Sequence, residues 1–213
     1  MRLTLFIFIT LLFYGCTKSL FQSKCTTEKS PAGFITRFET SKGSFDIEVN
    51  RKWSPAAVDR FYQLVKYGFY NKALFYRAVP NFVVQFGSTD SVAISKWSKF
   101  KIPDEKVLYG NRKGTISFAR AGKESRGTEL FINLSDNSRL DTMMYEEVEG
   151  FPAFGNVISG QDVVESIFSD YGDNTMNMLD TMYINRSKFL SQFPKLDSII
   201  KAYIVKPTDK RPI

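Results

Sequence analysis

The sequence contains no histidine, and this absence removes much of the usual catalytic chemistry. Without an imidazole the chain cannot form a Ser–His–Asp triad or a Cys–His dyad, and most catalytic zinc sites are excluded as well. It also lacks the glycine-rich loops that bind nucleotides, and the acidic residues between positions 136 and 149 do not have the spacing of a calcium loop. We therefore expect a function that needs no nucleophile, no proton transfer, no metal and no cofactor.

Long apolar runs are also scarce, and the longest mostly apolar stretch is residues 3–14, directly after Arg2. That stretch is too short to span a bilayer comfortably, so residues 1–15 are predicted to be a signal peptide. Its end, residues 12–16, resembles the lipobox of bacterial lipoproteins, which implies lipidation at Cys16. A polar tether is expected over residues 16–33. These features indicate a membrane-anchored lipoprotein of the cell envelope, facing the periplasm or the exterior, with ordinary secretion as the alternative.

Cysteine is the next scarce residue, with only Cys16 and Cys25 in the chain. No disulfide framework is possible beyond one bridge between them, and that bridge would need an oxidising compartment and an unlipidated Cys16. If Cys16 is lipidated, we expect Cys25 to be an unpaired, mobile thiol in the tether. The folded domain itself has no cysteine, so its stability must come from packing and hydrogen bonds.

The composition permits one sizeable hydrophobic core. Of the 213 residues, 43% are hydrophobic and 15% are aromatic, which suits a single domain with short appendages. We place this domain at residues 34–206 and a C-terminal tail at residues 207–213. The 29 basic residues exceed the 22 acidic ones and give a net charge of +7, but they are scattered along the chain. This pattern is compatible with a nearby anionic membrane and does not indicate nucleic-acid binding; we expect a monomer.

Hydrophobic periodicity predicts strands and two helices. Residues 43–49 alternate between polar and apolar, which is typical of one arm of a β-hairpin with a single buried face. Ser54 as an N-cap and Pro55 in the first helical position begin a predicted helix that runs until Gly68. An apolar stripe at helical spacing predicts a second helix over residues 161–169, and for both stripes we expect core packing.

Residues 75–87 form the most informative segment, because they place a cation and an amide in an otherwise apolar, strand-forming run. The valines and phenylalanines favour a buried strand, so Arg77 and Gln85 should lie on rigid backbone with polar ends that need partners or a substrate. A groove with one hydrogen-bonding handle is built in this way. Taken alone, Arg77 could also be an edge residue whose stem covers apolar surface while its charge stays in water.

A second segment adds weight to the first interpretation. Residues 114–122 form a strand of small residues, and residues 127–133 contain a Gly-x-x-Leu-Phe-Ile pattern. Taken with the aromatic residue, Arg, Pro, Phe and Gln of the first segment, they make the chain resemble the cyclophilins over residues 36–171, with a last strand at 202–205. The resemblance implies a mainly β fold, namely a closed antiparallel β-barrel capped by two α-helices, and peptidyl-prolyl isomerase activity.

The resemblance also implies a set of site residues. Arg77 matches the family's catalytic arginine, and Gln85 would orient both Arg77 and the substrate carbonyl. Ala119 would leave room for the peptide, and the backbone of Arg120 would pair with it. The wall around the prolyl ring corresponds to Phe82, Val83, Phe131 and Leu140, although for the two phenylalanines taken alone core packing is an equal alternative.

Some positions depart from the family pattern. Phe151 stands where a pocket His or Tyr is common, and Glu129 stands where the family usually carries Gln. A carboxylate at this position could pair with Arg77 or with Arg120, and the pairing could either hold Arg77 in place or divert it. Residues 173–194, which are rich in methionine, exceed what a minimal cyclophilin needs; we expect them to pack on the domain, with a partner-binding surface as the alternative.

Prolyl isomerisation suits a chain without histidine, nucleotide-binding loop or metal site, because the reaction is a rotation about an amide bond and breaks no bond. A fixed guanidinium at Arg77 can donate a hydrogen bond to the pyramidal imide nitrogen, and so bind the twisted state better than either planar isomer. Three functions stay open: an isomerase acting on exported proteins, a catalytically weak module that binds proline-containing segments as a chaperone would, and a structural envelope lipoprotein. We favour the isomerase because Arg77, Phe82 and Gln85 are all present.

Overall fold

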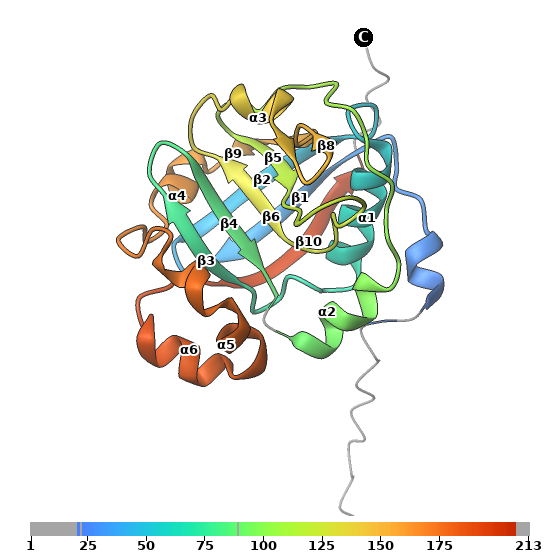
Figure 1. The fold of residues 1–213 in the computed structure, drawn as a ribbon. Helices are drawn as coiled ribbons and strands as arrows, with labels where there is room; N and C mark the ends of the chain where they lie inside the picture. The colour runs from blue at the N-terminus through green and yellow to red at the C-terminus, as the bar shows by residue number, and fades with distance from the viewer. Residues whose placement is uncertain (1–20, 22, 89, 208–213) are drawn as a thin grey trace, which may run out of the picture.

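One antiparallel sheet curls around an aromatic core (Figure 1). The computed structural model describes residues 21, 23–88 and 90–207, so the predicted signal peptide and Cys16 lie outside the described residues. The strands follow one another in space in the order β10-β1-β2-β9-β5-β6-β4-β3. Their bounds are β1 (Gly33–Thr40), β2 (Gly43–Asn50), β3 (Leu74–Val79), β4 (Val83–Gly87), β5 (Thr115–Phe118), β6 (Leu130–Asn133), β9 (Ala153–Ser159) and β10 (Ile199–Pro207), with a separate pair β7 (Met144–Tyr145) and β8 (Val148–Glu149).

The sheet is strongly curled but not closed, so the expectation of a closed barrel is wrong. Its end strands, β3 and β10, meet only at an isolated bridge between Leu74 and Ser198. Further along β3, Ala78 is bridged to Gly172, in the segment after α4 (Gln161–Glu165). The free edge of β3 is therefore shared between β10 and this later segment, and a continuous ladder between the two end strands cannot form.

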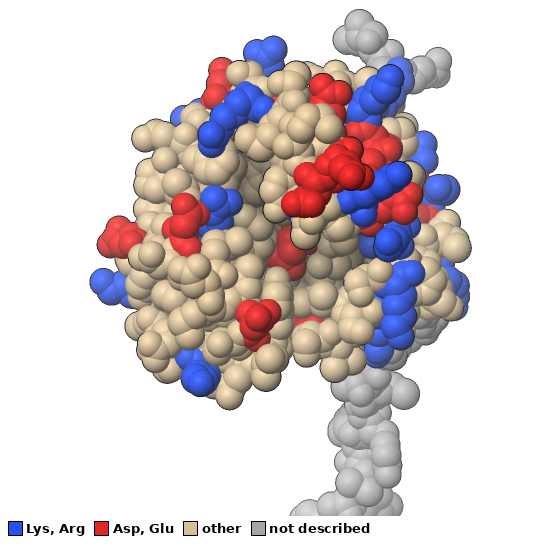
Figure 2. Space-filling view, viewed as in Figure 1, with Lys and Arg blue, Asp and Glu red and all other residues tan. Residues whose placement is uncertain are grey.

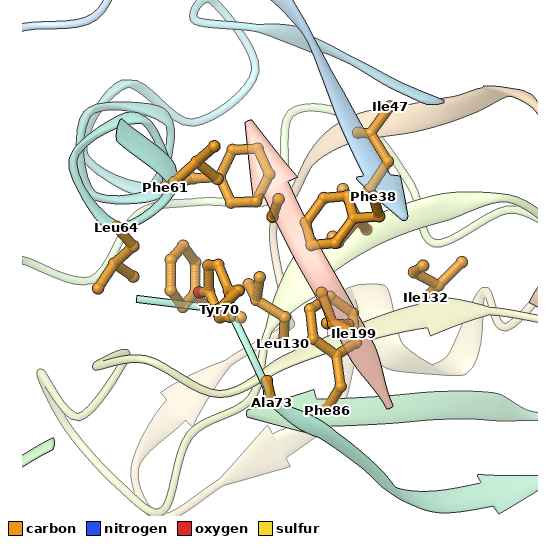
Figure 3. Packing of buried hydrophobic residues seen from close by; sticks show 14 of the residues in the cluster. Phe38, Ile47, Phe61, Leu64, Tyr70, Ala73, Phe86, Leu130, Ile132 and Ile199 are labelled. Atoms are coloured by element: carbon orange, nitrogen blue, oxygen red, sulfur yellow. The ribbon is translucent and has the colours of Figure 1, made fainter. Parts of the chain in front are cut away.

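Helix α1 (Pro55–Lys66) packs its apolar face into the hollow of the sheet. Figure 3 shows Phe61 and Leu64 projecting from α1 toward Tyr70 and the surrounding strands. The ring of Phe61 lies 5.1 Å from that of Phe154, and Phe38 stacks on its cross-strand neighbour Phe45 at the same distance between centroids. Aromatic pairs of this kind add stability beyond the area they bury, so the aromatic content of the chain is concentrated where it holds the sheet to the helix.

Helix α1 begins at Pro55, as the sequence predicts, but Ser54 does not cap it in the expected way. Ser54 precedes the helix and makes no side-chain cap of its own; its hydroxyl donates to Glu105. The amide of Ala56 donates to the same carboxylate at 2.8 Å. A carboxylate from a distant loop therefore satisfies the first helical amides and also offsets the positive end of the helix dipole.

Helix α4 is shorter than the predicted helix over residues 161–169. Its last turn tightens, with the amide of Ile167 donating to the carbonyl of Val164. The next amide, that of Phe168, leaves the helical pattern and donates to Asp197 at 2.8 Å. The remaining helices are α2 (Ser91–Ser98), α3 (Arg139–Thr142), α5 (Leu179–Ile184) and α6 (Arg186–Gln192), with 3₁₀ turns η1 (Ser23–Thr27) and η2 (Asn174–Met178).

The described part of the expected tether packs on the domain. Asp59 accepts hydrogen bonds from the amide and hydroxyl of Ser30, at 2.9 and 3.0 Å, and Gln63 donates to the carbonyl of Glu28 at 2.7 Å. Cys25 lies in η1 and is only 1% exposed, against the expectation of a mobile thiol. Contacts with α1 that depend on folded side chains, which a polar composition does not reveal, hold this stretch in place.

The segment 173–194 folds into η2, α5 and α6, beside β3 (Figure 1). It forms its own apolar cluster in which Met182, Phe189 and Phe193 pack against Leu74 and Tyr76 of β3. The segment therefore packs on its own domain. In the part of the chain that the structure describes, none of these helices has both the length and the apolarity to cross a bilayer.

Candidate active site

Arg77 lies on β3 directly opposite Gln85 of β4. Its Nε donates to Asp173 Oδ1 at 2.6 Å, and its Nη1 donates to Gln85 Oε1 at 3.2 Å. The side chain is 21% exposed, so the guanidinium is held at the surface by two acceptors and does not swing freely in solvent. Two hydrogen bonds to different nitrogens fix the plane of the group.

Gln85 continues this hydrogen-bonded chain into the protein. Its Nε2 donates to the hydroxyl of Tyr76 at 2.8 Å, and Tyr76 is only 1% exposed. The pairing of β3 with β4 is irregular between Leu74 and Arg77, and Tyr76 lies in this irregular stretch. Because the amide of Gln85 is occupied at both ends, it is a rigid support for Arg77.

The apolar residues expected to form the prolyl wall lie together. Val83, Phe131 and Leu140 are buried in one cluster, and partly buried hydrophobic residues pack against it: Phe82, Ala119, Met143 and Phe151. The rings of Phe131 and Phe151 meet edge to face at 5.9 Å. Arg77 borders this cluster, with its Cζ 5.5 Å from the centre of the Phe82 ring.

The side chain of Arg120 contacts Phe151 and Val148. Its Cζ lies 4.4 Å from the centre of the Phe151 ring, and its Nη2 donates to the carbonyl of Val148 at 2.8 Å. The residue is 8% exposed, and this burial lowers the pKa of the guanidinium. Its own amide and carbonyl make no hydrogen bond to the described residues.

In the described structure Glu129 forms no ion pair with Arg77 or with Arg120, so neither of the two pairings that the sequence left open is made. The residue as a whole is partly exposed, but its Oε2 is buried without a hydrogen-bond partner in the described residues, while its Oε1 accepts from the hydroxyl of Thr128 at 3.4 Å. Burial raises the pKa of Glu129 to about 7, although the hydroxyls of Tyr76 and Thr128 oppose the rise. The acceptor that does reach Arg77 is Asp173, which the sequence did not single out.

The face that carries β4 and β6 is hollowed at its centre, with acidic side chains beside and within the hollow (Figure 2). This occurs although the whole chain has a net charge of +7. Among the described residues, no group of three or more carboxylate or thiol side chains is placed to hold a metal ion.

Comparison with known proteins decides the family. The model for the family described as "Cyclophilin type peptidyl-prolyl cis-trans isomerase/CLD" matches residues 35–188. The chain belongs to the cyclophilin family. The match includes both segments that carry the sequence resemblance, the apolar cluster and Arg77.

Relatives and solved structures agree with the assignment. A peptidyl-prolyl cis-trans isomerase of Acinetobacter baylyi is 32% identical over 138 residues, which cover 64% of this chain and 72% of that protein. An Arabidopsis thaliana isomerase, CYP18-2, is 31% identical over 71% of this cyclophilin and 91% of its own length. A crystal structure of a cyclophilin-type isomerase from Cryptosporidium parvum matches with a TM-score of 0.59 at 20% identity, over 82% of this chain and 98% of its own. The fold is thus mainly β and cyclophilin-like.

Proposed function

We propose that this cyclophilin catalyses prolyl isomerisation by donating a hydrogen bond from Arg77 to the twisted imide nitrogen. The observation that carries the proposal is the position of Arg77, held by Gln85 at 3.2 Å and lying 5.5 Å from the Phe82 ring. In this position a charged donor borders an apolar cluster of the kind that receives a proline ring.

The energetics suit such a donor. Amide resonance sets a rotation barrier of about 18–20 kcal/mol, and rotation converts the planar nitrogen into a pyramidal one with an available lone pair. Arg77 would therefore bind the twisted state more tightly than either planar isomer. Shortening isomerisation from tens of seconds to about a millisecond needs about 5–6 kcal/mol, which a charge-assisted hydrogen bond in a partly dry groove can largely supply.

The substrate class follows from the groove. We propose that extended, proline-containing segments bind with the proline against Phe82, Val83, Phe131 and Leu140, close to Ala119 and Phe151. The free backbone groups of Arg120 would pair with the peptide chain. The Cryptosporidium parvum isomerase whose fold this chain shares was also crystallised in the presence of the dipeptide Ala-Pro, and that structure matches with a TM-score of 0.56 at 20% identity.

We further propose that the clients are exported proteins, because the N-terminal apolar stretch and Cys16 have the features of a lipoprotein signal. Lipidation at Cys16 would hold the enzyme at a membrane. Mass spectrometry of the membrane fraction, compared with a Cys16→Ser variant, tests this: an acylated N-terminal cysteine supports the anchor, and an unmodified or soluble protein contradicts it.

The isomerase proposal is tested by cis-to-trans conversion of a short Xaa-Pro peptide. Arg77→Ala should lower kcat/KM by about 100-fold or more, since it removes a donor used only in the twisted state. Arg139→Ala is the matched control, because the Cζ of Arg139 lies 4.6 Å from the same Phe82 ring and it should lose far less. Circular dichroism verifies that both variants are folded, and equal losses in the two variants would contradict a specific role for Arg77.

The alternative is a cyclophilin-fold module that binds prolyl segments without useful turnover. The ion pair between Arg77 and Asp173 favours it, because a carboxylate at 2.6 Å partly offsets the charge of the guanidinium. A folded protein that binds a prolyl peptide in calorimetry but does not accelerate isomerisation would establish this function in place of the enzyme.

A further inference from the structure

Asp173 belongs to a segment that a minimal cyclophilin does not need, yet it contacts the arginine to which we assign catalysis. We propose that Asp173 is a positioning residue for Arg77, and that segment 173–194 is therefore part of the active site. This inference rests on the proposed isomerase function.

The geometry of the pair suits a positioning role. Asp173 accepts a hydrogen bond from Nε of Arg77 and Gln85 accepts one from Nη1, so two different nitrogens hold the guanidinium in place. For Nη2 no hydrogen-bond partner is found in residues 21, 23–88 and 90–207. Two of the three nitrogens are thus used for orientation, and one remains to donate to a substrate.

The backbone that carries Asp173 is tied to the strand that carries Arg77. Gly172, its neighbour, is bridged to Ala78, the neighbour of Arg77. One position earlier, Tyr171 packs its ring against that of Phe193, which belongs to segment 173–194, with the ring centroids 5.1 Å apart. Asp173 is therefore presented to Arg77 by fixed backbone, although its side chain is 66% exposed.

The same segment supports Arg77 by a second route. Tyr76 packs in the apolar cluster of the segment, together with Met182 and Phe189. Its hydroxyl accepts from Gln85, and Gln85 accepts from Arg77. Loss of the segment's packing would consequently disturb both supports of the guanidinium.

The expected effect lies in kcat. Arg77 donates to the imide nitrogen only in the twisted state, so a misplaced guanidinium weakens binding of that state while leaving the binding of planar substrate unchanged. Because Asp173 is largely exposed and its charge is screened, we expect Asp173→Ala to lower kcat by about 3- to 10-fold with KM unchanged. Asp173→Asn keeps an acceptor oxygen and should retain more of the activity than Asp173→Ala.

The experiment compares these variants in the full chain with Asp170→Ala, which removes an exposed carboxylate three positions away for which no hydrogen bond or ion pair is found in the described residues. A second readout is the Nε–H signal of Arg77 in ¹H–¹⁵N spectra, assigned through its loss in Arg77→Ala; it should exchange faster with water in Asp173→Ala but not in Asp170→Ala.

The outcomes are distinguishable. A drop in kcat and a faster-exchanging Nε–H in Asp173→Ala alone support the inference. Wild-type kcat and an unchanged signal overturn it while the isomerase function stands, and so does an equal loss in Asp170→Ala, since this would be a general charge effect. If the wild type is inactive or Arg77→Ala is unimpaired, the proposed function fails and the catalytic role of Asp173 fails with it, while the Nε–H signal still shows whether Asp173 holds Arg77.

Discussion

Between pH 5 and pH 7 the stability of this protein should fall, because one buried carboxylate, that of Glu129, titrates in this interval. Burial raises the pKa of Glu129 from 4.5 to about 7. The chain has no histidine, so no ordinary imidazole titration hides the effect. The pH dependence in this window therefore reports mainly on Glu129.

The sign and size of this change in the free energy of unfolding follow from the linkage between proton binding and folding. Between the two pKa values the unfolded chain has lost its proton at Glu129 while the folded protein keeps it, so the free energy of unfolding decreases as pH rises. The stabilisation is fully present below about pH 4.5 and is lost as pH passes through 7. A shift from 4.5 to about 7 corresponds to about 3 kcal/mol at most.

Urea unfolding at pH 5 and pH 7.5 measures this change, with Glu129→Gln as the test variant. The neutral amide removes the titration, so the variant should show a nearly flat stability across this interval. At pH 7.5 it should be more stable than the wild type by about 1–2 kcal/mol, after a cost for an imperfectly paired amide. Glu149→Gln, on exposed β8, is the matched control and should keep the wild-type slope. A wild type with no slope, or an unchanged slope in Glu129→Gln, would refute the reasoning.

Two further changes test the packing around the site and the tether. Burial alone would raise the pKa of Asp59, but hydrogen bonds from Arg51 and Ser30 outweigh it and lower the value to about 2. Asp59→Asn should therefore cost about 1–2 kcal/mol at pH 7, and the cost should vanish as pH falls from about 4 toward 2, measured by thermal unfolding; a pH-independent cost would contradict this. An added Cβ in Gly87→Ala would collide with the buried Glu129 carboxylate, so we expect a loss of about 1–3 kcal/mol in denaturant unfolding. Gly127→Ala, where the added atom has room, should change little, and equal losses would argue against a specific collision.

The sequence correctly predicted those strands and helices whose positions depend on residues close to one another in the chain. The alternation over residues 43–49 marks β2, and Ser54 followed by Pro55 marks the start of α1. Such signals act over one or two turns of chain, where side-chain period and a missing amide constrain the backbone directly. The predicted end of the second helix at residue 169 was wrong: α4 ends at Glu165, and the amide of Phe168 donates to a distant carboxylate, that of Asp197.

Much of the candidate site could also be predicted, because it lies on paired strands. Gln85 faces Arg77 across one strand pair and Phe131 across the next. Once β3, β4 and β6 are recognised, regular strand pairing brings these side chains together with Val83, whereas Leu140 reaches the same cluster from α3. Met143 joins the same cluster without a signal of its own, because α3 and the loop that follows it place it there.

The sequence by itself determined the alternation of β2 and the start of α1, which depend on short-range signals, and its motifs carried the resemblance to the cyclophilins that implied the residues around the proposed prolyl pocket. Only the tertiary structure decided that Asp173 reaches Arg77 from 96 positions away, that the Oε2 atom of Glu129 is buried without a hydrogen-bond partner among the described residues, and that β3 and β10 do not close the sheet. Each of these depends on which surfaces cover one another after folding. Desolvation and distance in space set the pKa of a carboxylate and its ion-pair partner, and they also decide whether the edge of a strand is paired. Neither desolvation nor distance in space can be read from the order of residues along the chain.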